Sequence, residues 1–228
     1  MNGETFETLG DAIQSAAATG STIKLASNAV NAGVAVAEGS EFVLDLNGYE
    51  LLMTGPGAGS QGTKTLGLQL LKGSTVIIKN GRIDFEQEDP SQPLKMGIQN
   101  YSNLTLDNVK LTGGPTIQYV VSNNCGDVVF KNKTSITPTG DNVAFDVWYG
   151  MNVIYDEGVN VTIADNTVQI NGKVEFGKHN RASLEDFAEH ASLTCPSDMD
   201  LNISVLTPPC AWTDNGDGSK TFRYQLAD

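Results

Sequence analysis

The sequence predicts an all-β chain whose short strands stack as parallel coils, and three observations lead to this fold class. First, an asparagine ends a short apolar segment five times, at intervals of 24 to 34 residues: Asn47, Asn80, Asn108, Asn132 and Asn166. Second, a tight turn precedes each asparagine by six to eight residues. Third, the chain has 24 glycines and only 18% charged residues, which suits strands joined by frequent turns. The pattern indicates a repeating unit of strand, tight turn, strand, asparagine turn and strand.

A single unit of three short strands is too small to bury its own apolar residues. Stacking the units, so that each strand pairs in parallel with its counterpart, closes one continuous core over residues 21–177. With about 4.8 Å between strands, about six coils give a rod on the order of 30 Å long. Asparagine suits the corner because it tolerates left-handed backbone geometry and its amide can bond the asparagine of the next coil. We therefore interpret the five asparagines as a structural ladder.

Residues 1–20 predict an N-terminal helix that caps the rod. One helical face carries small or apolar side chains, namely Leu9, Ala12, Ile13 and Ala16. Thr8 with Asp11 resembles a capping box at the start, and Gly20 is a typical stop signal. A helix this short is not stable alone, so we expect it to lie on the open apolar end of the stack.

Residues 178–228 depart from the repeat and predict a small α+β module that serves as a cap or an attachment site. Residues 182–193 have a helical apolar pattern, and residues 201–228 are rich in strand formers. The Asn215-Gly216 and Asp217-Gly218 pairs lie between strand-forming runs and predict a hairpin. Cys195 and Cys210 could form a disulfide bond or remain reduced.

The charge of the chain argues against two classes of partner. The formal net charge is −13 and the sequence pI is about 4.4. Such a surface repels nucleic-acid phosphates and anionic lipids, so we expect neither nucleic acid nor membrane as a partner. An acidic polysaccharide is disfavoured as well, unless a local basic patch or a metal ion is present. No run of apolar residues approaches the length of a membrane span, and no secretion signal is recognisable after Met1.

Two phrases carry a family resemblance. LGDAIQSAAATGSTIKLAS, with its helix followed by a first strand, and FVLDLNGYEL, with its Leu-Asp-Leu-Asn-Gly run, are similar to the opening of right-handed parallel β-helix proteins of the pectate-lyase-like superfamily. The resemblance covers about residues 1–177 and implies that fold. Members of the superfamily include polysaccharide lyases and hydrolases, adhesins, and accessory proteins of phage tails and capsids, so the resemblance does not select one activity.

Carboxylates offer the nearest candidates for catalysis. Within the segment 82–89, Asp84, Glu86 and Glu88 share one face if the strand continues, but a solvated charged loop edge is the interpretation that we favour. Three further aspartates adjoin the ladder at unequal offsets and do not form one cluster in the sequence: Asp45, Asp107 and Asp165. The histidines, His179 and His190, have no Cys or Asp at ligand spacing. We therefore predict no catalytic, cofactor-binding or metal-binding residue.

Aromatic residues provide a candidate contact surface. Strand alternation in the segment 145–157 places Trp148 and Tyr149 on opposite faces, so one of them should point outward. Trp212 in the C-terminal module is similarly placed. An exposed aromatic ring suits sugar stacking or subunit contact, whereas the alternative is packing beneath a loop, including the loop that holds Tyr155, or against the C-terminal module.

These observations favour a non-catalytic structural or adhesive protein. A short rod followed by an attachment-like module is similar to phage virion components such as capsid decorations, head fibres and tail-associated proteins. On this hypothesis the chain forms a homo-oligomer, contacts other virion proteins, has a surface glycan as a candidate partner, and is assembled in the host cytoplasm without a cofactor. Either the entry-helix end or the 178–228 module could be the dock, and we favour the module because it departs from the repeat. The alternatives are a small polysaccharide lyase or hydrolase, and an extracellular or cell-surface location.

Overall fold

The computed structural model describes residues 4–59, 64–86, 90–150 and 158–226, and these residues form a predominantly β structure with parallel strands and two helices. One sheet has seven strands, all of them paired in parallel. In chain order its strands are β3 (Val34–Val36), β6 (Leu66–Leu70), β8 (Met96–Asn100), β10 (Tyr119–Asn123), β13 (Val143–Tyr149), β16 (Lys173–Lys178) and β18 (Ile203–Val205). The predicted β class with parallel strand pairing is therefore confirmed.

The second sheet has thirteen strands and two short side branches. Its main path is β1 (Thr22–Lys24), β4 (Glu41–Asp45), β7 (Thr75–Phe85), β9 (Asn103–Gly113), β11 (Gly126–Lys131), β14 (Val159–Ile163), β17 (Ala191–Pro196), β20 (Ser219–Tyr224) and β19 (Cys210–Asp214). The side branches are β2 (Ala29–Asn31) with β5 (Glu50–Met53), and β12 (Ser135–Thr137) with β15 (Gln169–Ile170). All of its named strand pairs are parallel except β17–β20 and β19–β20.

The long strands β7 and β9 span the corner between the main path and the branches. The first half of β7 pairs with β4 and its second half with β5, and the change of partner occurs around Asn80. Tight turns ahead of the main-path strands contain Gly39, Gly73 and Gly126, with φ of 69°, 73° and 89°. Only glycine adopts such angles at little cost, which explains the small turns in the sequence. The Glu157-Gly158 turn lies partly outside the described residues.

The core consists of columns of inward-pointing apolar side chains, one per strand. Paired strands place Leu44, Ile78, Leu106, Phe130 and Ile163 in register, and none of these residues is more than 2% exposed. This column runs from β4 to β14. Each strand thus buries its apolar residues against its neighbours, as the repeat pattern requires.

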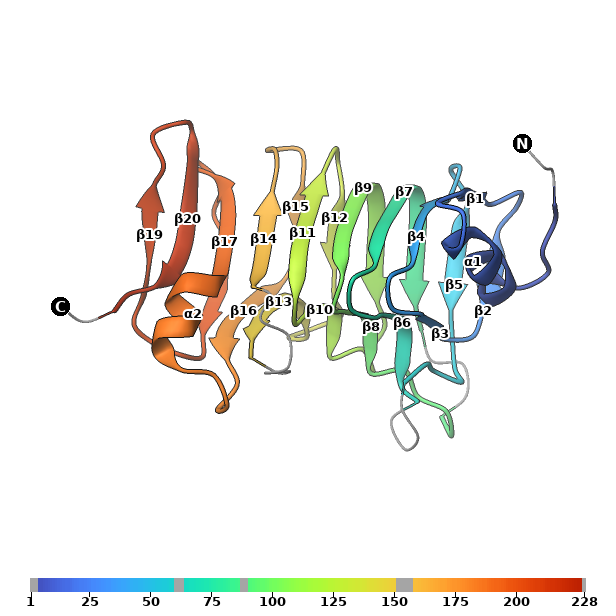
Figure 1. The fold of residues 1–228 in the computed structure, drawn as a ribbon, viewed down its shortest axis with the longest axis horizontal. Helices are drawn as coiled ribbons and strands as arrows, with labels where there is room; N and C mark the ends of the chain where they lie inside the picture. The colour runs from blue at the N-terminus through green and yellow to red at the C-terminus, as the bar shows by residue number, and fades with distance from the viewer. Residues whose placement is uncertain (1–3, 60–63, 87–89, 151–157, 227–228) are drawn as a thin grey trace.

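Helix α1 (Leu9–Ala17) lies at the β1 end of the molecule, against β1, β3 and β4 (Figure 1). Its buried residues are the four on the predicted apolar face. The side chain of Thr8 accepts a hydrogen bond from the Asp11 backbone N–H at 3.1 Å and donates one to the Asp11 carboxylate at 2.7 Å, as in the predicted cap. Gly20, with φ of 64°, follows the helix.

The C-terminal region begins differently from the sequence expectation. Helix α2 (Leu184–His190) is shorter than the predicted 182–193 segment, because Ala191 and Leu193 are fully buried in β17. Parallel pairing also continues past Gly177, since β17 pairs with β14 and β18 with β16. The predicted hairpin is present as β19–β20, and it lies at the end opposite α1 (Figure 1).

No helix in the described ranges is long and apolar enough to cross a bilayer.

Candidate functional site

The corner asparagines share an unusual backbone geometry. Asn47, Asn80, Asn108 and Asn132 have φ between 53° and 60°. Asparagine accepts this left-handed conformation more readily than most residues, so the backbone itself selects the residue type. Asn166 is not among the described residues with positive φ, so the fifth member of the column occupies a turn of a different kind.

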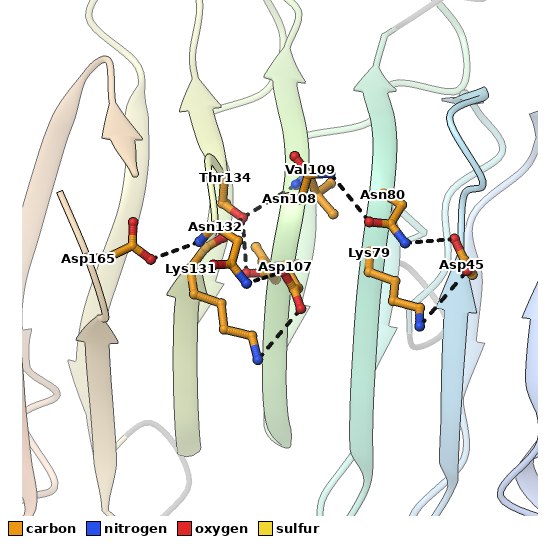
Figure 2. A network of polar contacts seen from close by, with 11 residues as sticks. Asp45, Lys79, Asn80, Asp107, Asn108, Val109, Lys131, Asn132, Thr134 and Asp165 are labelled. Carbon is orange, nitrogen blue, oxygen red and sulfur yellow. Dashed lines mark hydrogen bonds and ion pairs between the residues drawn. The ribbon is translucent and has the colours of Figure 1, made fainter. Parts of the chain in front are cut away.

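The side chains at the corner bond from one strand to the next, but through aspartate as well as asparagine. Asn80 Nδ2 donates to Asp45 Oδ1 at 3.2 Å, Asn108 Nδ2 to Asn80 Oδ1 at 3.3 Å, and Asn132 Nδ2 to Asp107 Oδ1 at 2.8 Å (Figure 2). Asn108 and Asn80 thus form a direct asparagine–asparagine bond, whereas the bonds from Asn80 and Asn132 are accepted by the carboxylates of Asp45 and Asp107.

The two outer ladder asparagines extend these contacts toward the ends of the stack. Asn47 Nδ2 donates to the backbone carbonyl of Leu25 at 3.0 Å. Asn166 Nδ2 donates to the Asp198 carboxylate at 3.0 Å. All five asparagines therefore bond to a residue at least 22 positions away in the sequence.

Charges alternate along the same corner. Strand register aligns five residues of successive strands: Lys24, Asp45, Lys79, Asp107 and Lys131. Lys79 Nζ lies 3.9 Å from Asp45 Oδ2, and Lys131 Nζ lies 3.6 Å from Asp107 Oδ2 (Figure 2). Sequence reasoning had noted the aspartates but not the lysines. The available signal was the Lys-Asn pair at 79–80 and again at 131–132.

Asp165 also belongs to this corner. Its carboxylate accepts hydrogen bonds from the Thr167 hydroxyl, from the Asn132 backbone N–H at 2.9 Å and from the Thr167 backbone N–H at 2.8 Å. These bonds, the one from the Thr167 hydroxyl foremost, lower the pKa of Asp165. The aspartates beside the ladder therefore act as hydrogen-bond acceptors that join neighbouring turns.

A second pair of asparagines, which the sequence did not reveal as special, lies inside the molecule. Asn100 and Asn123 are in register at the ends of β8 and β10, and both are 0% exposed. Asn100 Oδ1 accepts from the Ser102 hydroxyl at 2.7 Å and from its backbone N–H at 3.1 Å. Asn100 Nδ2 donates to the Ser102 carbonyl at 3.0 Å and to the Cys125 carbonyl at 3.4 Å. The buried amide thus satisfies the backbone of two tight turns.

The seven-stranded sheet carries its own polar column. Register aligns Gln69, Gln99, Ser122, Asp146 and Glu175 on successive strands. Gln69 Nε2 donates to Gln99 Oε1 at 2.9 Å, and the Ser122 hydroxyl donates to Asp146 Oδ2 at 3.1 Å. Asp146 and Glu175 are neighbours in this column, so two carboxylates from β13 and β16 lie on adjacent strands.

Asp146 has the most unusual environment of these groups. It is 6% exposed, and its Oδ1 accepts a hydrogen bond from the Asn123 backbone N–H at 2.6 Å. Burial raises the pKa of Asp146 to about 7, and the charge of Glu175 acts in the same direction. A carboxyl group that holds a proton near neutral pH is suited to general acid chemistry.

Glu175 is held from two sides. The Tyr119 hydroxyl donates to Glu175 Oε2 at 3.0 Å, and Lys173 Nζ lies 2.7 Å from Glu175 Oε1. Burial, followed by this bond to Glu175, raises the pKa of Tyr119 to about 12. Asp146, Glu175, Tyr119 and Lys173 thus form a cluster of titratable groups on the seven-stranded sheet.

The predicted aromatic contact residues are all half-buried. The Tyr149 ring stacks on two rings of α2, with centroid-to-centroid distances of 6.3 Å to Phe187 and 6.0 Å to His190. The ring centroids of Trp212 and Phe222 are 5.1 Å apart, and Lys220 Nζ lies 4.7 Å from the centroid of the Trp212 ring. The contacts of Tyr149 are thus made to the C-terminal region, and those of Trp212 lie within that region. Trp148 is half-buried in β13, and Tyr155 lies outside the described residues.

The other sequence candidates are dispersed. Asp84 is 4% exposed and bonds to Arg82 Nε at 2.8 Å, whereas Glu86 is exposed beyond the end of β7; Glu88 lies outside the described residues. The described residues contain no group of three or more His, Cys, Asp or Glu placed to hold a metal ion. Cys195 and Cys210 are free thiols in the structure and do not form the disulfide bond that the sequence allowed.

Comparison of the chain with protein-family models, with curated proteins and with solved structures finds no match.

Proposed function

We propose that the chain is a right-handed parallel β-helix of about six coils that acts as a non-catalytic structural or adhesive component of a phage virion. The strand order supports the fold, because strands of one sheet alternate along the chain with strands of the other and pair in parallel with their successors. Right-handed crossovers are by far the commoner kind between parallel strands. Capsid decoration, head fibre and tail-associated protein are the roles that suit a small rod.

One observation carries the structural role. Each asparagine side chain along the corner bonds to a neighbouring strand or turn, from the Leu25 carbonyl to the Asp198 carboxylate, across most of the stack. They are engaged in holding turns together, while α1 and the β19–β20 hairpin occupy the two ends (Figure 1). A rod with occupied ends and cross-linked corners is suited to displaying its flanks.

The C-terminal region offers a means of attachment. Four large apolar side chains among its described residues are exposed, with fractions of 39% for Leu184, 37% for Val205, 47% for Leu206 and 53% for Leu226. Val205 ends β18, the last strand of the seven-stranded sheet, and Leu206 follows it directly. Exposed apolar residues at a sheet edge support contact with a second copy or with another virion protein.

Particle composition tests this proposal. Virions from the strain that encodes the chain, including particles from induced prophages, would be purified by density gradient and analysed by quantitative mass spectrometry. We expect the chain at a fixed ratio to the major capsid protein, and we expect particles from a deletion strain to lack it. Recovery of the chain only outside the particles would refute the virion role.

A second candidate function is favoured by the neighbouring carboxylates of Asp146 and Glu175. Glycoside hydrolases use two carboxyl groups, one of them with a raised pKa, and the raised pKa of Asp146 fits the acid. A polysaccharide screen with reducing-end detection, with and without Ca²⁺, tests this alternative. Cleavage that is lost on Asp146→Asn, in a variant that remains folded, would establish it. No cleavage of any substrate would favour the structural role.

A further inference from the structure

A groove opens beside the asparagine corner, away from the Asp146 cluster. Its volume is about 540 Å³, and its floor runs across β5, β7 and β9. Register places Glu50, Arg82 and Lys110 side by side on these three strands. Asn28, Tyr49 and Asn108 complete the lining that matters here.

Two positive charges meet in this groove although the chain carries a net charge of −13. Arg82 and Lys110 are direct neighbours in register, and adjacent strands are only about 4.8 Å apart. Like charges so placed repel each other and favour the binding of an anion between them. Here the basic residues are adjacent, unlike the alternating charges of the neighbouring corner.

Both basic groups retain hydrogen-bonding capacity. Lys110 is exposed, and no carboxylate of the described residues lies within 4.0 Å of its Nζ. Arg82 uses Nε for Asp84 at 2.8 Å, and its side chain is still 48% exposed. The contact with Asp84 fixes the guanidinium group, so its terminal amino groups are positioned in advance.

The remaining lining suits hydroxyl groups and an apolar ring face. Tyr49 lines the groove and is 36% exposed, so an aromatic side chain is available there. Glu50 and Asn108 Oδ1 are acceptors, and the bond that Asn108 Nδ2 donates to Asn80 fixes the orientation of that amide. Asn28 Oδ1 accepts from the Glu50 backbone N–H at 3.0 Å, which leaves Asn28 Nδ2 as a donor.

We propose that this groove binds a carboxylated sugar unit of a surface glycan. The carboxylate lies between Lys110 and Arg82, the apolar side of the ring faces Tyr49, and hydroxyl groups donate to Glu50 and Asn108. The proposal rests on the adhesive role inferred above and names its ligand class. Glu50 disfavours an acidic peptide or a nucleic acid, because either brings several anions but few hydroxyl donors.

Binding of single sugars to the full-length chain tests the proposal. The probes are D-glucuronate and N-acetylneuraminate, with D-glucose and N-acetylmannosamine as uncharged counterparts, followed by saturation-transfer NMR and calorimetry. We expect the acidic sugars to bind at least about tenfold more tightly than the neutral ones, which corresponds to about 1.4 kcal/mol. Equal binding of acidic and neutral sugars, or no binding of either, overturns the proposal.

Matched variants locate the site. Lys110→Gln should weaken the binding of acidic sugars about tenfold, and Tyr49→Ala should weaken it by more than Lys110→Gln does. Both side chains are exposed, so we expect both variants to fold. Lys131→Gln removes a lysine that is paired with Asp107 outside the groove and should change affinity less than about twofold. Equal losses for Lys110→Gln and Lys131→Gln would refute the assignment, as would preferential binding of poly-glutamate.

The outcome is separable from that of the virion proposal. If the chain is found in virions but the acidic sugars do not bind, the groove assignment fails and the structural role stands. If the sugars bind through Lys110 but the chain is absent from virions, the groove assignment stands and the particle role fails.

Discussion

The corner asparagines and the interior asparagines differ in why the fold needs them. Asn80, Asn108 and Asn132 have positive φ and side chains that are at least partly exposed. Asn100 and Asn123 are 0% exposed and are not among the described residues with positive φ. The backbone selects asparagine at the corner, whereas side-chain hydrogen bonding selects it in the interior. The same residue, stacked in the same way, should therefore respond very differently to substitution.

Asn100→Leu should have the largest effect of the changes considered. The leucine would remove the hydrogen bonds that Asn100 makes to the Ser102 N–H and the Cys125 carbonyl in the buried interior. Each buried unsatisfied group costs about 1–3 kcal/mol, so we expect a loss of about 3–5 kcal/mol in the free energy of unfolding. Urea unfolding followed by circular dichroism measures it.

The control for this prediction is Asn108→Leu at the exposed corner. It should lose about 1–2 kcal/mol, from backbone strain and one solvent-accessible bond. If the two substitutions destabilise the protein equally, the distinction between interior and corner asparagines is incorrect.

The buried carboxyl group of Asp146 provides the next largest effect, and its sign depends on pH. Burial raises its pKa to about 7, whereas in the unfolded chain an aspartate titrates near about 3.9. Between these values the native state holds a proton that the unfolded state has released. The contribution of Asp146 to stability therefore falls as the pH rises from about 4 to about 7.

Asp146→Asn removes this dependence while preserving the shape of the side chain. At pH 8 the variant should be more stable than the parent chain by an amount on the order of a few kcal/mol, and the gain should shrink toward pH 5. Asp165→Asn is the control with the opposite sign, because hydrogen bonds lower the pKa of Asp165 and its contribution is lost as the pH falls. Parallel pH profiles for the two variants would contradict the assignment.

Sequence reasoning could predict the features that are determined within a few residues. The corner turns at Asn80, Asn108 and Asn132 are local, since a left-handed residue follows a short apolar strand. The parallel β class and the α1 cap follow from the repeat and from the apolar face around Ile13. These elements need no knowledge of strand register.

Features that depend on register could not be predicted. Asn100 meets Cys125 only because β8 and β10 pair at one offset, and between Gln99 and Tyr101 it gives no signal of its own. The Lys79–Asp45 contact and the adjacency of Arg82 with Lys110 likewise join residues about 30 positions apart. The sequence could not decide whether Tyr149 is an exposed contact residue or a packed one, because its neighbours in α2 are distant in the sequence.

The backbone explanation of the corner can be tested separately from its hydrogen bonds. Asn132→Ala and Asn132→Gly both remove the 2.8 Å bond to Asp107, but only alanine is strained at φ of 53°. Alanine should therefore be less stable than glycine by about 1 kcal/mol at this position. At Asn166, which lacks a positive φ, the order should reverse, because glycine costs about 0.5–1 kcal/mol relative to alanine. Thermal unfolding of the four variants decides the matter, and the same order at both sites would exclude a backbone origin.

The alternating charges should matter least, although they are the most regular feature of the corner. Lys79 Nζ lies 3.9 Å from Asp45, and the two side chains are 34% and 17% exposed, so solvent and salt screen much of the attraction. Asp45 also keeps its bonds from the Asn47 N–H and from Asn80 Nδ2 when the lysine is removed. Lys79→Met should therefore cost no more than about 0.5 kcal/mol in urea unfolding at low salt, and this difference should vanish in about 1 M NaCl. A loss that exceeded that of Asn132→Ala and persisted in high salt would mean that charge, and not backbone geometry, holds the corner together.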